Sequence, residues 1–158
     1  MDYKQKYIKY KTKYLEQVGG RRKSKKKLHR NISINNNMNS IKYNYTENVS
    51  EPWFSLILLG LKTVEGRKNK GRFKEMKVGD IVEWTNDNFK PRSVLTRVTG
   101  KAEYPTFREY LEKEGLDKCL PGMEKFGIED GLSIYYKYYT KEDEKEFGVV
   151  AIRIEPIQ

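Results

Sequence analysis

The chain has 158 residues, enough for one domain of roughly 100–150 residues with a hydrophobic core. One cysteine and one histidine exclude an internal disulfide and argue against a Cys/His zinc site, so we expect no metal and no cofactor. No apolar run approaches the roughly 20 residues that span a bilayer and no secretory signal is evident, so an intracellular protein is expected.

The net charge of +10 lies entirely in the first third of the chain. Residues 1–50 hold 13 Lys and Arg against 3 Asp and Glu, whereas residues 51–158 hold 19 of each sign. Any electrostatic attraction to nucleic acid is therefore expected from a basic N-terminal tail first.

The tail divides into two parts. In residues 1–16, tyrosines recur every three or four positions among lysines, which predicts a short basic amphipathic helix. That stripe fits a membrane surface, the folded domain or a partner protein equally well. Residues 17–40 contain seven Lys and Arg from Arg21 to Arg30 and then an Asn-rich stretch, which predicts a disordered linker that binds nucleic acid non-specifically.

The remainder, residues 41–158, predicts one α+β domain. Alternating apolar residues predict strands over 41–45, 63–67, 80–85, 92–99 and 147–154, and residues 68–79 form a basic loop. Ser50 is expected as the N-cap of a helix that reaches Gly60, and further helices are expected over 106–113 and 129–139. Short strands with about three flanking helices favour a small, partly closed β-barrel.

One segment combines opposite charges where a helix passes into a strand. At a period of two, Thr63, Glu65 and Arg67 share one face of the strand, and Lys62 lies at the preceding turn. Positive neighbours would keep the Glu65 carboxyl ionised by lowering its pKa. The arrangement suits a phosphate, a polar base edge or a positioned water, although a structural ion pair at the barrel mouth explains the same spacing.

The pattern Gly60-x-Lys62-x-x-Glu65-x-Arg67 resembles the signature of the ASCH domain, a family of the PUA-like superfamily of small β-barrels. The segment from Lys77 to Val82 and the last strand are similar to the same family. The resemblance implies a cleft lined by the signature residues and a role in RNA-linked processes.

Some small bacterial relatives in that family are amidohydrolases that remove the acetyl group of N4-acetylcytidine. Lys62 matches their catalytic Lys, but Glu65 stands where they carry a Thr nucleophile. The resemblance therefore implies a tentative catalytic set of Lys62, Glu65 and Thr63, with Glu114 (or Glu112) as the assisting acid.

The expected ligand-binding set is wider than the catalytic one. Trp53 can stack on a base or belong to the core, while Lys70 and Arg72 in the basic loop can contact phosphates or remain solvated. The full set is Gly60, Lys62, Glu65, Arg67, Trp53, Lys70 and Arg72.

Three functions remain open on the sequence. The preferred one is a module that binds RNA or a modified nucleotide, with the tail adding non-specific phosphate affinity, because the segment offers no clear Ser, Cys or His nucleophile. The second is an amidohydrolase acting on an acylated nucleoside. The third rests on the N-terminal Tyr/Lys pattern, which resembles lead-ins of giant DNA virus proteins and implies a tail that docks a partner or virion component, in the host cytoplasm or the virion.

Overall fold

The computed structural model describes residues 41–86 and 92–157. The chain falls into two units, residues 1–41 and 42–158, and every helix and strand given below belongs to the second. The predictions of a helix over residues 1–16 and a linker over 17–40 lie outside the described residues.

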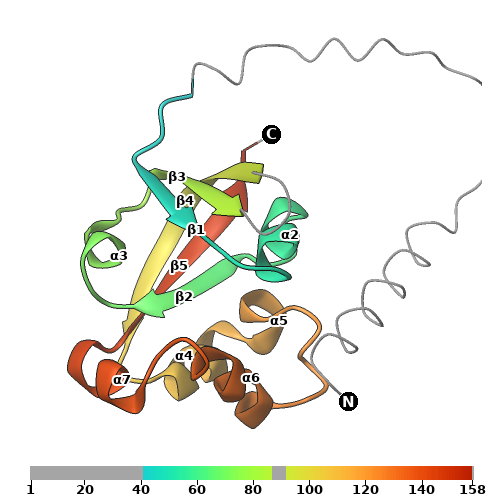
Figure 1. Cartoon of the computed structure of the whole chain (residues 1–158), viewed down its shortest axis with the longest axis vertical. Helices are drawn as coiled ribbons and strands as arrows, with labels where there is room; N and C mark the ends of the chain where they lie inside the picture. Colours follow the sequence, from blue (N-terminus) through green and yellow to red (C-terminus); the bar gives the residue numbers. More distant parts are fainter. Residues whose placement is uncertain (1–40, 87–91, 158) are drawn as a thin grey trace, which may run out of the picture. The chain divides into compact units, whose positions relative to one another are not determined.

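Five strands form one curled sheet in the order β1-β3-β4-β5-β2 (Figure 1). Strand β1 runs parallel to β3, and every other neighbouring pair is antiparallel. The strands are β1 (Tyr45–Asn48), β2 (Val64–Lys68), β3 (Ile81–Asn86), β4 (Arg92–Tyr104) and β5 (Val149–Pro156). The expected α+β fold with a partly closed β-barrel is confirmed, and its sheet curls into a half-barrel.

Six helices accompany the sheet in the described residues: α2 (Trp53–Leu58), α3 (Arg72–Glu75), α4 (Phe107–Glu114), α5 (Leu116–Cys119), α6 (Ile128–Tyr135) and α7 (Lys141–Phe147). Helices α4 to α7 gather on the side of β2 and β5, and α2 lies apart from them, in contact with β3 and β5 (Figure 1). None of these helices has the length and apolar composition to cross a bilayer.

The burial of strand residues is consistent with the positions of β3 and β5 inside the sheet. Every second residue of β3 is buried, and β5, between β4 and β2, buries its first four residues, Val149 to Ile152. Trp84 of β3 is fully buried and donates its indole N–H to Thr96 Oγ1 at 2.8 Å. Burying the indole with its donor satisfied avoids the penalty of an unpaired polar group.

The predicted helix over 106–113 is confirmed with its ends. Thr106 Oγ1 accepts from the N–H of Glu109 at 3.1 Å, and Gly115 ends the helix with φ 91°. Gly can take this left-handed conformation without steric strain.

Several element boundaries differ from the predictions. Strand β1 starts at Tyr45 rather than Ile41, β4 continues to Tyr104, and the helix predicted over 129–139 ends at Tyr135. The early end of α6 has a local cause, because Thr140 and Asp143 form a capping box that begins α7. Tyr136 and Tyr138 therefore lie on a turn, and Tyr139 lies between that turn and α7. Helix α7 was missed since its charged sequence buries no residue.

The prediction that Ser50 caps the helix before Gly60 is also wrong. Helix α2 begins at Trp53, its N-cap position is Pro52, and no side chain caps it. The Ser50 hydroxyl is instead within 3.3 Å of the Tyr138 hydroxyl. A residue expected to serve its own helix thus joins two distant segments.

Candidate functional site

A pocket of about 290 Å³ opens beside β2. Four segments line it: the stretch from β1 into α2, the stretch around β2, the segment after α5, and the segment around the end of α6. They contribute Asn48, Val49, Ser50, Trp53, Lys62, Glu65, Gly66, Arg67, Leu120, Ile134, Tyr135, Tyr138 and Tyr139. Polar groups from β2 thus face aromatic and aliphatic side chains across one small volume.

Lys62 is the most deeply buried charge of the pocket, with 2% of its surface exposed. The chain turns sharply after α2, where Gly60 has φ 68° and the N–H groups of Leu61 and Lys62 both bind the Leu56 carbonyl. The Lys62 ammonium donates to the carbonyl oxygens of Val64, at 2.8 Å, and Cys119. Its third partner is Glu65 Oε2 at 3.1 Å, so all three N–H donors of the ammonium are occupied.

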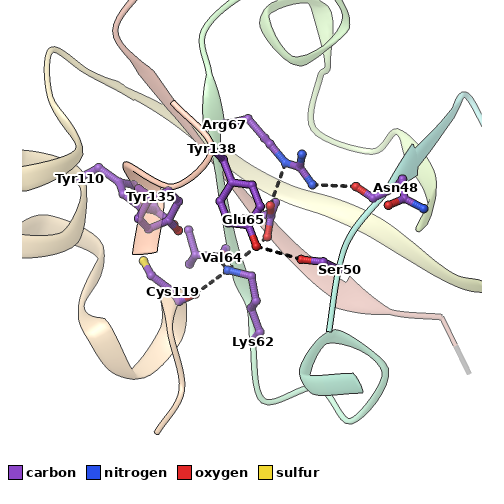
Figure 2. A network of polar contacts seen from close by, with 10 residues as sticks. All are labelled: Asn48, Ser50, Lys62, Val64, Glu65, Arg67, Tyr110, Cys119, Tyr135 and Tyr138. Carbon is purple, nitrogen blue, oxygen red and sulfur yellow. Dashed lines mark hydrogen bonds and ion pairs between the residues drawn. The ribbon is translucent and has the colours of Figure 1, made fainter. Parts of the chain in front are cut away.

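Glu65 lies between two cations (Figure 2). Its Oε1 contacts Arg67 Nε at 2.8 Å, and its Oε2 contacts Lys62. Burial alone would raise the pKa of Glu65, but the charges and hydrogen bonds of Lys62 and Arg67 outweigh it and hold the pKa below its ordinary value. The carboxylate is therefore ionised at neutral pH and has lone pairs left for a ligand.

Arg67 is fixed from several directions. Besides Glu65, its Nη2 donates to the Asn48 carbonyl at 3.0 Å, and its guanidinium carbon lies 5.1 Å from the Phe73 ring centroid and 5.6 Å from that of Trp84. Burial alone would lower the pKa of Arg67, but the neighbouring Glu65 and Tyr139 raise it above its ordinary value. The side chain stays charged and its orientation is set before any ligand arrives.

The ring of an aromatic residue in α4 packs closely against β2 at Gly66. The ring of Tyr110 lies against Gly66, where a Cβ atom would approach Tyr110 Cζ to 2.6 Å. The Tyr110 hydroxyl is 3.0 Å from that of Tyr135, and Tyr135 stacks on Phe107 with ring centroids 4.6 Å apart. The wall beside Glu65 is therefore a packed aromatic cluster.

Four predicted site residues come together in this pocket: Trp53, Lys62, Glu65 and Arg67. Trp53 is 7% exposed, and its ring centroid lies 5.6 Å from Lys62 Nζ. The expectation that Glu65 and Arg67 share a strand face agrees with their 2.8 Å contact.

The other predicted site residues do not line the pocket. Gly60 forms the preceding turn, and the Thr63 backbone bonds Lys118 and Ile154. Arg72 Nε pairs with Glu47 Oε1 at 3.0 Å, while Lys70 Nζ lies 4.2 Å from the Phe147 ring centroid.

Glu114 belongs to a separate cluster. Its Oε1 accepts from the Tyr104 hydroxyl at 2.7 Å and from Arg153 Nη2 at 2.6 Å, and its Oε2 accepts from Arg153 Nε at 3.0 Å. The structure does not bring this carboxylate to the pocket that holds Lys62.

The sequence did not predict that Tyr135, Tyr138 and Tyr139, which form the far wall of the pocket, would line it. Tyr138 and Tyr139 were expected within a helix over 129–139, but they lie between α6 and α7 and line the pocket. The Thr140-x-x-Asp143 pattern is the signal that would have ended the helix earlier.

Cys119, whose carbonyl oxygen accepts from Lys62, also carries a buried thiol. Burial raises the pKa of the Cys119 thiol to about 11 despite the opposing effect of Lys62, so the thiol is protonated at neutral pH. Across residues 41–86 and 92–157, no group of three or more His, Cys, Asp or Glu is placed to hold a metal ion. The pocket therefore offers an acceptor, a guanidinium and aromatic surface.

Comparison with known proteins identifies the family. The family model of the ASCH domain matches residues 48–158. The chain is similar to the crystal structure of the hypothetical protein PH0355, with 38% identity over 72% of this chain and 98% of that one and a TM-score of 0.63. It is also similar to the solution structure of protein PF0455 from Pyrococcus furiosus, with 37% identity over 72% of this chain and 97% of that one and a TM-score of 0.57. A search among curated proteins found no significant match. The chain belongs to the ASCH domain family.

Proposed function

We propose that this protein binds an unpaired base of RNA, or a modified nucleoside, in the pocket beside β2. The observation that carries the proposal is the ionised Glu65 carboxylate, held between Lys62 and Arg67 next to aromatic side chains. A carboxylate accepts hydrogen bonds from the amino and imino groups of bases, and aromatic rings stack on base faces.

The size and charge of the pocket support the binding of a nucleotide. Its volume of about 290 Å³ suits one small ring system rather than a paired or stacked helix. Two cations against one carboxylate leave a net positive charge, which favours a phosphate beside the bound base. Single-stranded RNA presents bases in this accessible form.

Substitution of Glu65 tests the proposal in the full-length protein. The probes are a short mixed-sequence single-stranded RNA, the four common nucleosides and N4-acetylcytidine, and affinity is measured by titration calorimetry. We expect Glu65→Gln to weaken the tightest probe about 10-fold, since one base-edge contact contributes about 1–3 kcal/mol. Glu114→Gln is the matched control, because this carboxylate is equally buried but lies outside the pocket. Equal affinities for both variants and the wild type would reject the proposal.

An acetate assay with one of the same probes, N4-acetylcytidine, distinguishes the amidohydrolase alternative from binding. The Lys62 ammonium has all three donors engaged, which disfavours it as a base or nucleophile. Incubation with N4-acetylcytidine should therefore leave free acetate at the level of the buffer blank. Enzyme-dependent acetate that disappears in Lys62→Met would replace binding by turnover as the function.

The basic run from Arg21 to Arg30 is proposed to add non-specific phosphate affinity. Replacing its seven Lys and Arg with Gln should make the slope of log affinity against log salt shallower, by roughly 0.7 for each lost contact to single-stranded RNA. An unchanged slope would favour the alternative in which the tail docks a partner or virion component.

A further inference from the structure

Two rims of the pocket are joined by one side-chain contact. The hydroxyls of Ser50, between β1 and α2, and Tyr138, between α6 and α7, lie 3.3 Å apart although 88 positions separate them in the chain. Both residues line the pocket. In Figure 2 the Tyr138 ring extends toward Ser50 in front of Glu65.

Tyr138 differs from the tyrosines around it. Tyr135 is buried with its hydroxyl on Tyr110, and Tyr139 stacks on Phe107 with centroids 5.2 Å apart. Tyr138 is 61% exposed. Packing holds the first two rings in place, whereas a turn and one hydroxyl contact hold the third.

From this contrast we propose that Tyr138 is a movable aromatic cover of the pocket. Its hydroxyl rests on Ser50 in the free protein, and the ring leaves Ser50 to stack on the face of a bound base. The inference rests on the proposed function and deepens it, because it makes a planar aromatic ring the part of the ligand that the cover recognises.

The relative strengths of the two contacts favour this exchange. An exposed hydroxyl pair is readily replaced by hydrogen bonds to water, so its release has a small net effect. Stacking one base on an aromatic side chain strengthens binding by roughly 5- to 150-fold. Rotation of the Tyr138 side chain on its turn needs no change in α6 or α7, whose ends are fixed by their own backbone bonds and by the Thr140 capping box.

The hydroxyl and the ring of Tyr138 can be tested separately. Tyr138→Phe and Ser50→Ala remove the contact between the rims but keep the ring, whereas Tyr138→Ala removes both. Tyr43→Ala is the matched control, because Tyr43 is 45% exposed and does not line the pocket. Thermal unfolding first establishes that each full-length variant folds.

The probes are cytidine and adenosine 5′-monophosphates, with ribose 5-phosphate as the ligand that lacks a base. We expect Tyr138→Ala to weaken the better nucleotide roughly 5- to 150-fold and to leave ribose 5-phosphate unchanged. Tyr138→Phe and Ser50→Ala should keep or improve nucleotide affinity and speed association in stopped-flow measurements. Tyr43→Ala should behave as wild type.

Failure of the cover and failure of the proposed function give different results. If Glu65→Gln weakens nucleotide binding but Tyr138→Ala does not, or if Tyr138→Phe loses as much affinity as Tyr138→Ala, the movable cover is rejected and the pocket stands. If neither nucleotide binds, or Glu65→Gln has no effect, the proposed function is rejected, and the movable cover is rejected with it.

Discussion

Glu65 and Glu114 are two buried carboxylates with similar surroundings and different relations to the pocket. They are 6% and 5% exposed, each contacts an arginine, and each has its pKa held below the ordinary value by its partners against the opposing effect of burial. Burial, charge and the direction of the pKa shift therefore do not separate the carboxylate that borders the pocket from the one that lies outside it.

The number and position of the donors do separate them. Glu114 receives three hydrogen bonds from Tyr104 and Arg153, whereas each oxygen of Glu65 contacts one cation and the residue borders the pocket. The partners differ as well, since Lys62 is 2% exposed while the Arg153 side chain is 45% exposed. The chain's own groups nearly saturate Glu114 and leave Glu65 with capacity for a ligand.

The largest expected difference follows from removing a cation of each cluster. Lys62→Met should lower the free energy of unfolding by about 3–5 kcal/mol, because it leaves a buried carboxylate short of one partner and two carbonyls without their donor. Arg153→Met should lower it by no more than about 1 kcal/mol, because water reaches Glu114 once the half-exposed arginine is gone. Urea denaturation measures both, and equal losses would show that the two ion pairs are energetically alike.

The glycine beside each cluster sharpens the comparison. At Gly66 a Cβ atom would lie 2.6 Å from Tyr110 Cζ, within the packed aromatic cluster, so Gly66→Ala should lower stability by about 1–3 kcal/mol. At Gly100 a Cβ atom would lie 3.2 Å from Arg153 Cδ and Nη1, and that flexible side chain can move, so Gly100→Ala should stay within about 0.5 kcal/mol of wild type.

A double-mutant cycle assigns the Gly66 effect to its cause. Adding Tyr110→Leu to Gly66→Ala should give a loss smaller than the sum of the two single losses, because the clash no longer exists. Strict additivity would mean that the methyl group disturbs β2 for some other reason.

Sequence patterns predicted the near wall of the site because its residues are close along one strand. The period of two places Glu65 and Arg67 on one face, and the observed 2.8 Å contact between them agrees. The signature around Lys62 also pointed to the family that the comparison shows. The giant-virus resemblance of the N-terminal segment stays a prediction.

The far wall could not be predicted in this way because it depends on contacts between distant segments. Ser50 and Tyr138 are 88 positions apart, and no local spacing pairs them. Tyrosines at positions 135, 136 and 139 suited a helix face, yet a competing cap at Thr140 turned the chain and moved Tyr138 to the pocket rim. Where two local signals compete, periodicity alone places the side chains on the wrong element.

The smallest expected difference between the clusters is in how the free energy of unfolding declines at acid pH. Each glutamate has a folded pKa below its ordinary value of 4.5, so the folded state binds the proton less readily than the unfolded chain. Its stabilising contribution is fully present above pH 4.5 and is lost as the pH falls through the folded pKa. Glu65→Gln and Glu114→Gln should therefore both flatten the decline of unfolding free energy below that pH.

Salt should distinguish the two variants. In about 1 M NaCl, where the Debye length is about 3 Å, the ion atmosphere reaches half-exposed Arg153 and weakens its attraction to Glu114, so part of the flattening caused by Glu114→Gln should disappear. The flattening caused by Glu65→Gln should persist, because the side chains of Lys62 and Arg67 are only 2% and 18% exposed and salt ions reach them less. Urea titrations across this pH range at low and high salt measure the difference. If salt reduces both effects equally, Glu65 is as open to the ion atmosphere as Glu114, and the contrast between a screened surface pair and a shielded pocket group does not hold.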